Sequence, residues 1–86
     1  MSRKFKIIVS KSSAKGLKKI PLPWKSRIIL SIDLLQENPF MGEKLWGKLE
    51  GKRKIRIYPY RIIYEVSEKE KTIIILETGH RSNVYK

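Results

Sequence analysis

A cluster of cations with aromatic residues between them is the part of this 86-residue sequence best suited to chemistry. Aromatic rings stand at Trp46, Tyr58 and Tyr60, and Glu50 is the one acid between residues 44 and 61. The cations of this segment are Lys44, Lys48, Lys52, Arg53, Lys54, Arg56 and Arg61. Cations bind phosphates and rings stack on splayed bases of single-stranded RNA, so the segment predicts an RNA-binding surface.

The charge of the whole chain points the same way. Twenty Lys and Arg residues against eight Asp and Glu give a formal net charge of +12 and an isoelectric point near 10.2. Such an excess destabilises the compact state by self-repulsion unless a polyanion or an acidic protein neutralises it. A solvated surface that serves only solubility is the alternative interpretation.

The remaining inventory excludes most enzyme classes. His80 is the only histidine and there is no cysteine, so neither a zinc site nor a Cys/His nucleophile pair can be assembled. The acids are scattered singly, and no glycine-rich phosphate loop occurs. We therefore expect no metal and no other cofactor, and what remains is chemistry on a phosphate by cations and a phenol.

RNA permits that chemistry because its own 2′-OH can attack the adjacent phosphodiester. A base must remove the hydroxyl proton, cations must stabilise the charge on the phosphate oxygens, and an acid must protonate the leaving 5′ oxygen. Neighbouring cations lower the pKa of lysine and tyrosine, so Lys54 or Tyr85 can serve as the base. The electrostatic clamps would be Arg56, Arg61 and Arg81. DNA lacks the 2′-OH and would be bound but not cut.

A hairpin of two strands must present these groups. Charged and apolar residues alternate from Lys54 to Ile57, which predicts a strand with one cationic face and one buried face. Gly51 provides a turn before this strand, and Tyr58-Pro59 connects it tightly to the strand 60–66. In that strand we predict that Tyr64 lies in the core. For Trp46, which precedes the hairpin, a core position and an exposed position are equally compatible with the sequence. Residues 44–50 predict a further strand or an extended lead-in.

The first half of the chain predicts a strand and two helices. Phe5 to Val9 is a β-branched run that we expect to be buried on both faces. Ser12 or Ser13 can cap the helix that follows, and Pro23 suits the start of a second helix. The second helix carries an apolar stripe of Trp24, Ile28, Ile32 and Leu35, and Asn38-Pro39 ends it.

Together these elements predict one α+β domain over residues 1–86. It contains an N-terminal strand, an antiparallel helical hairpin and three to four mainly antiparallel strands, with the helices on one face of the sheet. Thr72 to Glu77, apolar on both faces, predicts a central strand. No apolar run approaches the length of a membrane span and the start lacks a signal peptide, so we expect a cytoplasmic protein without a membrane partner.

Four motifs carry a resemblance to a known family: KLWGKL at 44–49, KIRI at 54–57, YRIIYEV at 60–66, and GHR followed by VY at 79–85. In this order, after a strand and a helical hairpin, they resemble the RelE/ParE superfamily of bacterial and archaeal toxins, and within it the RelE-like branch. The similarity extends over essentially the whole chain.

The resemblance implies a toxin of a type II toxin–antitoxin pair that enters the ribosomal A site and cuts translated mRNA. Its partners would be the ribosome, the mRNA and a cognate acidic, RelB-like antitoxin. The catalytic positions of RelE-like members correspond here to Lys54, Arg56, Arg61, Arg81 and Tyr85. His80 is an RNA-binding residue in this interpretation and an alternative base, as in some relatives; a surface or packing histidine is an equally open interpretation.

Two alternative functions stay open. ParE-type relatives share this fold but act on DNA gyrase, and fold alone does not separate the two activities. A basic RNA-binding module without catalysis is the other alternative.

Overall fold

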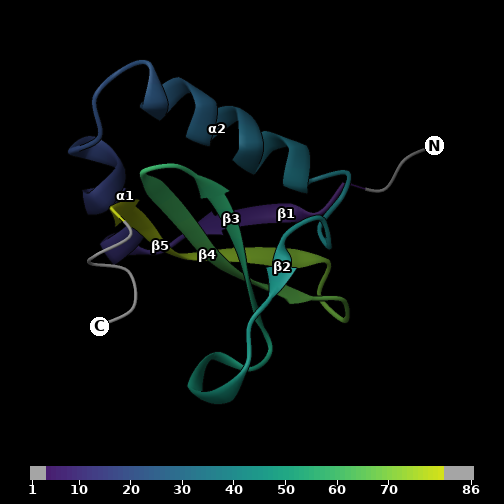
Figure 1. Ribbon diagram of the computed structural model, residues 1–86. Coiled ribbons are helices and arrows are strands. Elements are labelled where there is room, and N and C mark those ends of the chain that lie inside the picture. Colours follow the sequence, from purple (N-terminus) through teal and green to yellow (C-terminus); the bar gives the residue numbers. More distant parts are fainter. Residues whose placement is uncertain (1–3, 81–86) are drawn as a thin grey trace.

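The structure, a computed structural model, describes residues 4–80 (Figure 1). A parallel strand pair at one side and antiparallel pairs elsewhere make a single mixed sheet. Its elements in chain order are β1 (Lys6–Val9), α1 (Lys11–Lys18), α2 (Trp24–Leu35), β2 (Glu43–Lys44), the 3₁₀ turn η1 (Gly47–Leu49), β3 (Lys52–Ile57), β4 (Tyr60–Ser67) and β5 (Thr72–His80).

The five strands lie in the order β1-β5-β4-β3-β2. Strand β1 runs parallel to β5, and the helices and strands between them provide the long connection that a parallel pair needs. The predicted α+β fold, with an N-terminal strand, two helices and a mainly antiparallel set of strands, is confirmed. Strand β5 is interior, as the apolar run 73–76 predicted.

The helices cover one face of the sheet and enclose the core there (Figure 1). The predicted stripe of α2 is confirmed, because Ile28, Ile32 and Leu35 are buried and Trp24 packs beside them. Helix α1 adds Ile20 just after its end. The sheet contributes Ile62, Tyr64, Ile73 and Ile75 to the same cluster. The opposite face of the sheet carries neither helix.

The prediction that the first strand is buried on both faces was wrong. Ile8 and Val9 are each 43% exposed. Strand β1 lies at the edge of the sheet and pairs only with β5, and the helices cover one face alone. An apolar run therefore did not distinguish an edge strand from an interior one.

The predicted caps of the first helix were also wrong. Ser10 is the N-cap, and its hydroxyl accepts a hydrogen bond of 3.0 Å from the backbone N–H of Ser13. Ser12 instead donates to the carboxylate of Glu77, and the Ser13 hydroxyl is hydrogen-bonded to that of Thr78. The helix begins two residues after β1, so the serine nearest the strand satisfies the free N–H groups.

Residues 44–50 do not form the full strand that their alternation allowed. Only Glu43–Lys44 pairs with β3, and the chain then leaves the sheet through η1. The turn before β3 is confirmed, with Gly51 at φ +91°. Neither helix among the described residues is long and apolar enough to cross a membrane.

Candidate functional site

The predicted cationic strand face is present on the side of the sheet that the helices leave open. Residues directly opposite each other in an antiparallel pair project to the same face. Arg56 lies opposite Arg61, and Lys52 lies opposite Glu65. We call Lys52, Lys54, Arg56 and Arg61 the cationic face. Ile55 and Ile57 alternate with them and pack against the core, as predicted.

Arg56 and Arg61 form a directly opposed pair of like charges on this face. Directly opposed residues have Cβ atoms about 4.5–5.5 Å apart, and like charges in such a pair are destabilising. The Arg56 side chain is 58% exposed, so an anion can reach it. Two guanidinium groups at this spacing suit a bidentate or bridging contact with a phosphate.

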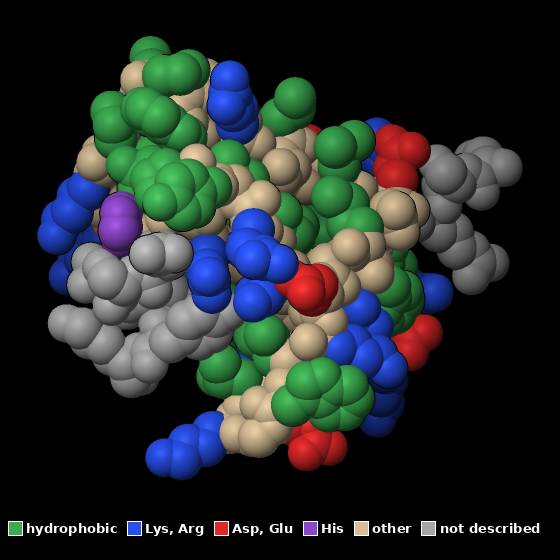
Figure 2. Space-filling model, in the orientation of Figure 1, with side chains coloured by type: hydrophobic (Ala, Val, Ile, Leu, Met, Phe, Trp, Pro, Cys, Tyr) green, Lys and Arg blue, Asp and Glu red, His purple; other side chains and the backbone are tan. Residues whose placement is uncertain are grey.

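Glu43 is a charged neighbour of this face that the sequence did not reveal. Strand β2 places it opposite Lys54. Its Oε1 lies 4.0 Å from Lys54 Nζ and 3.4 Å from Arg56 Nη2. Figure 2 shows Lys and Arg side chains gathered beside an acidic side chain near the middle of this view. The only sequence signal was a single acid, which is the first residue of β2, and a strand of two residues leaves no periodicity to detect.

A buried tyrosine fixes the loop that delivers Glu43. The hydroxyl of Tyr64 donates to the carbonyl of Pro39 at 2.8 Å and accepts from the N–H of Gly42 at 2.9 Å. A Cβ on Gly42 would stand 2.6 Å from that hydroxyl and 2.7 Å from the carbonyl oxygen of Lys54. Only glycine therefore permits β2 to approach β3 this closely. The core position predicted for Tyr64 is confirmed.

Burial raises the pKa of Tyr64 above its ordinary value of 10.0, against smaller opposing effects. These are the hydrogen bond from Gly42 and the positive charge of Arg53, both of which favour the phenolate. Tyr64 is therefore a neutral structural phenol at physiological pH.

Arg53 lies on the opposite face from the other β3 cations. It stands opposite Tyr64 in the sheet, on the helix side. Its Nη1 donates to the carbonyls of Gly42 at 2.9 Å and Phe40 at 3.2 Å, and its guanidinium lies 5.0 Å from the Phe40 ring centroid. Arg53 thus braces the same loop as Tyr64 and lies outside the cationic face.

Lys44 and Lys48 also lie outside the cationic face. Lys44 is opposite Arg53, and Lys48 is in η1; both are exposed. Trp46, for which core and surface were equally open, is 75% exposed. These residues form a second group beside the start of β3.

His80 is also separated from the cationic face. It lies opposite Tyr60, with which its ring makes an edge contact at 5.9 Å between centroids, and Tyr60 packs against the core on the helix side. The ladder between β4 and β5 shifts register after Ile63, so that no residue of β4 lies opposite Leu76. This bulge reverses which β5 residues face the helices. The geometry therefore disfavours His80 as a base beside Arg61.

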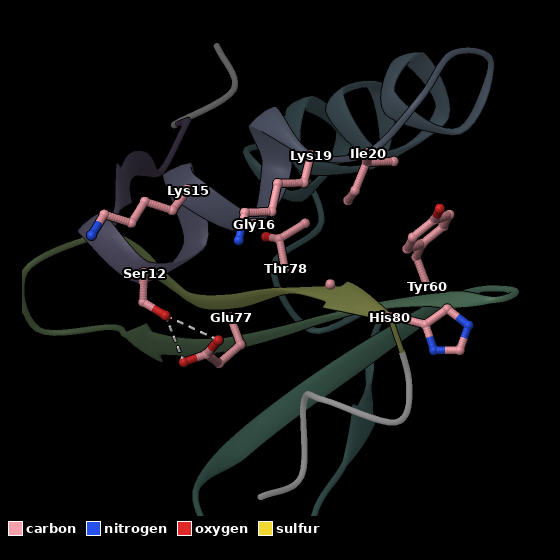
Figure 3. A pocket seen from close by; sticks show the side chains of 10 residues that line it. Ser12, Lys15, Gly16, Lys19, Ile20, Tyr60, Glu77, Thr78 and His80 are labelled. Atoms are coloured by element: carbon pink, nitrogen blue, oxygen red, sulfur yellow. Dashed lines mark hydrogen bonds between the residues drawn. The ribbon is translucent and has the colours of Figure 1, made fainter.

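A cavity of about 440 Å³ lies between α1 and the end of β5, on this helix side. Figure 3 shows Tyr60 and His80 next to each other at one end, and Ser12 bonded to Glu77 at the other. Lys15 of α1 and Lys19, the residue that follows this helix, also line the cavity (Figure 3). Gly79, which stands opposite Arg61, also lines it, so the cavity meets the cationic face only at the edge of the sheet.

Two predicted catalytic residues, Arg81 and Tyr85, lie outside the described residues. Of the others, Lys54, Arg56 and Arg61 share one face. Within residues 4–80, no three His, Cys, Asp or Glu side chains gather in a group that could hold a metal ion.

Comparison with known proteins identifies a protein family whose model matches most of the chain. The family model described as ParE toxin of type II toxin-antitoxin system, parDE, matches residues 7–85. The Toxin RelG of Mycobacterium tuberculosis is 32% identical over 54 residues, which cover 63% of this chain and 62% of RelG. The chain thus aligns with less than two thirds of the length of that relative.

Solved structures share the fold. The toxin–antitoxin complex RelBE2 from Mycobacterium tuberculosis contains a chain with a TM-score of 0.81 and 22% identity, covering 91% of this chain and 99% of that one. A chain of the RelB–RelE antitoxin–toxin complex from Methanococcus jannaschii has a TM-score of 0.71 and 28% identity, with coverages of 91% and 94%. The isolated E. coli RelE toxin has a TM-score of 0.79 and 21% identity, with coverages of 94% and 90%.

Proposed function

Because the chain belongs to the RelE/ParE toxin family of type II toxin–antitoxin systems, we propose that it is a RelE-like endoribonuclease that cuts translated mRNA on the ribosome. In this proposal the cut needs no metal ion, because the RNA provides its own nucleophile. The toxin would act by removing messages from translation.

The observation that carries the proposal is the pairing of Arg56 with Arg61 on the open face of the sheet, with Lys54 and Glu43 beside them. Several cations around one carboxylate supply both parts of the chemistry. The cations stabilise a phosphate whose charge increases, and the carboxylate accepts a proton.

In the proposed reaction, Glu43 removes the proton from the 2′-OH, and the 2′ oxygen attacks the adjacent phosphorus. Arg56 and Arg61 bind the non-bridging oxygens as charge builds on them. The bond to the 5′ oxygen breaks, and the Lys54 ammonium donates a proton to that leaving group. The products are a 2′,3′-cyclic phosphate and a 5′-OH end.

Lys54 and Tyr85 remain the alternative bases that the sequence suggested. Arg81 and Tyr85 belong to the proposed site through the family resemblance alone, as a further clamp and a further phenol. We place none of the proton transfers on His80, because Tyr60 and His80 face the helix side.

We also propose an acidic, RelB-like antitoxin as the partner. Two of the structurally similar chains come from RelB–RelE and RelBE2 complexes. The formal net charge of +12 favours an acidic protein over a neutral one. Such a partner would inhibit the toxin by covering the cationic face.

A gyrase poison is the second candidate, because the matching family model bears the ParE description. It predicts growth arrest with intact messages and altered DNA supercoiling. Mapping of mRNA 5′ ends after brief induction in growing cells separates the two candidates. Cuts confined to translated messages and phased with codons support the nuclease.

The Arg61→Ala variant is the key comparison in this experiment. If Arg61 acts like a donor in an oxyanion hole, its loss lowers the cleavage rate about 10²–10³-fold. Lys69→Ala, which removes a cation from the turn between β4 and β5, is the matched control and should cut like the wild type. Equal cutting by all three proteins would contradict the proposed site, and intact messages in the wild type would contradict the nuclease.

A further inference from the structure

The segment between β2 and β3 leaves the sheet and carries an exposed tryptophan. We call residues 45–51 the Trp46 loop. Gly47 at φ +68° and Gly51 at φ +91° occupy left-handed conformations that favour glycine, and they turn the loop out and back. Trp46 at its start is 75% exposed, whereas Trp24 packs against the core. A ring this large in water suggests a binding role.

The Trp46 loop encloses a small cavity with cationic walls. The cavity measures about 250 Å³, and its lining includes Trp46, Lys44, Lys52 and one acid, Glu50. Pockets for drug-sized ligands measure about 300–1,000 Å³, so this one suits a smaller planar group. An aromatic wall beside ammonium groups is the arrangement that binds a nucleobase and its phosphate.

Lys52 connects this cavity to the cationic face. Its side chain lines the cavity, and it belongs to the same face of β3 as Lys54 and Arg56. Arg56 lies four positions after Lys52 along the strand, which corresponds to about 13 Å at ~3.3 Å per residue. A single strand bound at Arg56 and Arg61 can therefore continue to the cavity.

We propose that the Trp46 loop is a base-binding subsite for single-stranded RNA, in which one base stacks on Trp46 and the flanking phosphates contact Lys44 and Lys52. This inference rests on the proposed function in one respect: the proposed function identifies the bound RNA as the mRNA next to the cleavage site. Charge favours RNA over a protein segment, because cations outnumber the single acid around the ring.

The apolar surface that would suit a protein helix lies elsewhere. Leu30 is 64% exposed and Leu34 56% exposed, and both stand on α2, across the sheet from the cationic face. Leu30 therefore offers a control for the loss of an exposed apolar side chain that is not part of the subsite.

The test measures binding to a short 2′-O-methyl RNA oligonucleotide of mixed sequence, which cannot be cut because its 2′ oxygen is blocked. Fluorescence anisotropy of a labelled oligonucleotide gives the dissociation constant. Trp46→Ala should raise it about 5- to 150-fold, the range found for one stacked base. Trp46→Phe, which keeps an aromatic face, should restore most of the affinity, and Leu30→Ala should bind like the wild type.

A second measurement reports on the ring itself. In the Trp24→Phe background, Trp46 is the only tryptophan, and stacking of a base should quench its emission as the oligonucleotide is added. Unchanged emission at saturating oligonucleotide would overturn the inference. Equal dissociation constants for Trp46→Ala and wild type would also overturn it and would assign the ring to a protein contact.

These outcomes separate the subsite from the nuclease. If Trp46→Ala loses affinity while mapped messages remain intact, the subsite stands and the proposed cleavage fails. If messages are cut and Trp46→Ala binds and cuts like the wild type, the nuclease stands and the subsite fails.

Discussion

Glu43 stands directly opposite Lys54, and its carboxylate reaches both Lys54 and Arg56 from a strand of two residues. The position depends on the loop before it, where Tyr64 and Arg53 hold Pro39, Phe40 and Gly42. Lys54 and Arg56 on the open face thus receive their acidic neighbour from a segment that is fixed on the other face.

Glu43→Gln tests the role of this carboxylate. The amide keeps the size of the side chain but accepts no proton, so cleavage should fall about 10²–10⁴-fold if Glu43 is the general base. Toeprinting or primer extension on ribosome complexes measures the rate. Glu65→Gln is the matched control, because Glu65 pairs with Lys52 at 3.9 Å on the same face and should be dispensable. An equal loss in both variants would indicate a general charge effect and not a base.

Tyr64→Phe tests the buried hydroxyl. Its removal leaves the Pro39 carbonyl and the Gly42 N–H without their partner, so the free energy of unfolding should fall by about 1–3 kcal/mol. Urea denaturation at neutral pH measures the change. Tyr60→Phe is the control, since the Tyr60 hydroxyl makes no hydrogen bond to any described residue and its ring contacts persist. Equal stabilities of the two variants would contradict this role.

The same phenol gives a pH dependence with a defined sign. Burial raises the pKa of Tyr64 in the folded state above 10.0, so the folded protein holds the proton more tightly than the unfolded chain. The contribution of the Tyr64 proton to the free energy of unfolding is complete below pH 10.0, and it is lost as the pH rises through the folded-state pKa. Denaturation curves at alkaline pH should show wild type losing stability faster than Tyr64→Phe. Parallel losses would show that other groups, such as the lysines, account for the whole effect.

Gly16→Ala reverses an ordinary rule of helix stability. Inside an exposed helix, alanine is about 1 kcal/mol more favourable than glycine. Here a Cβ on Gly16 would overlap the backbone carbonyl of Thr78, which cannot move aside as a flexible side chain can. We expect a net loss of about 1–3 kcal/mol, seen as a lower melting temperature. Lys18→Ala, at an exposed position of α1, should leave stability almost unchanged, and a stabilised Gly16→Ala would show that α1 lies farther from β5.

The sequence predicted the fold where local signals agreed with the tertiary arrangement. In β3 one face is solvent-exposed and the other packs against the core, so the period of two predicted both faces correctly. Lys54 and Arg56 lie on the open face, and Ile55 and Ile57 pack against the core. The stripe of α2 was equally clear. A β-branched run was less informative for β1, because it indicates a strand without showing whether the strand lies inside the sheet or at its edge.

The candidate site was predictable only in part, for reasons specific to single residues. His80 follows an alternating strand, but the unpaired Leu76 reverses the faces and moves it to the helix side. Arg53 was grouped with its charged neighbours by position in sequence, although its parity in β3 is that of Ile55. The position of Glu43 beside Lys54 could be predicted only from the pairing of β2 with β3, and a strand of two residues gives no sequence pattern for that pairing.

The pairing of Arg56 with Arg61 couples occupancy of the site to the stability of the whole domain. In the free protein Arg56 is paired with Glu43 at 3.4 Å, and a phosphate bound between Arg56 and Arg61 would add further favourable charge interactions. Ligand-induced thermal shifts should therefore report binding of any polyanion to this face, with a stabilisation that grows with concentration as RT ln(1 + [L]/Kd). An anion that binds the folded chain and not the unfolded chain would therefore also raise the free energy of unfolding.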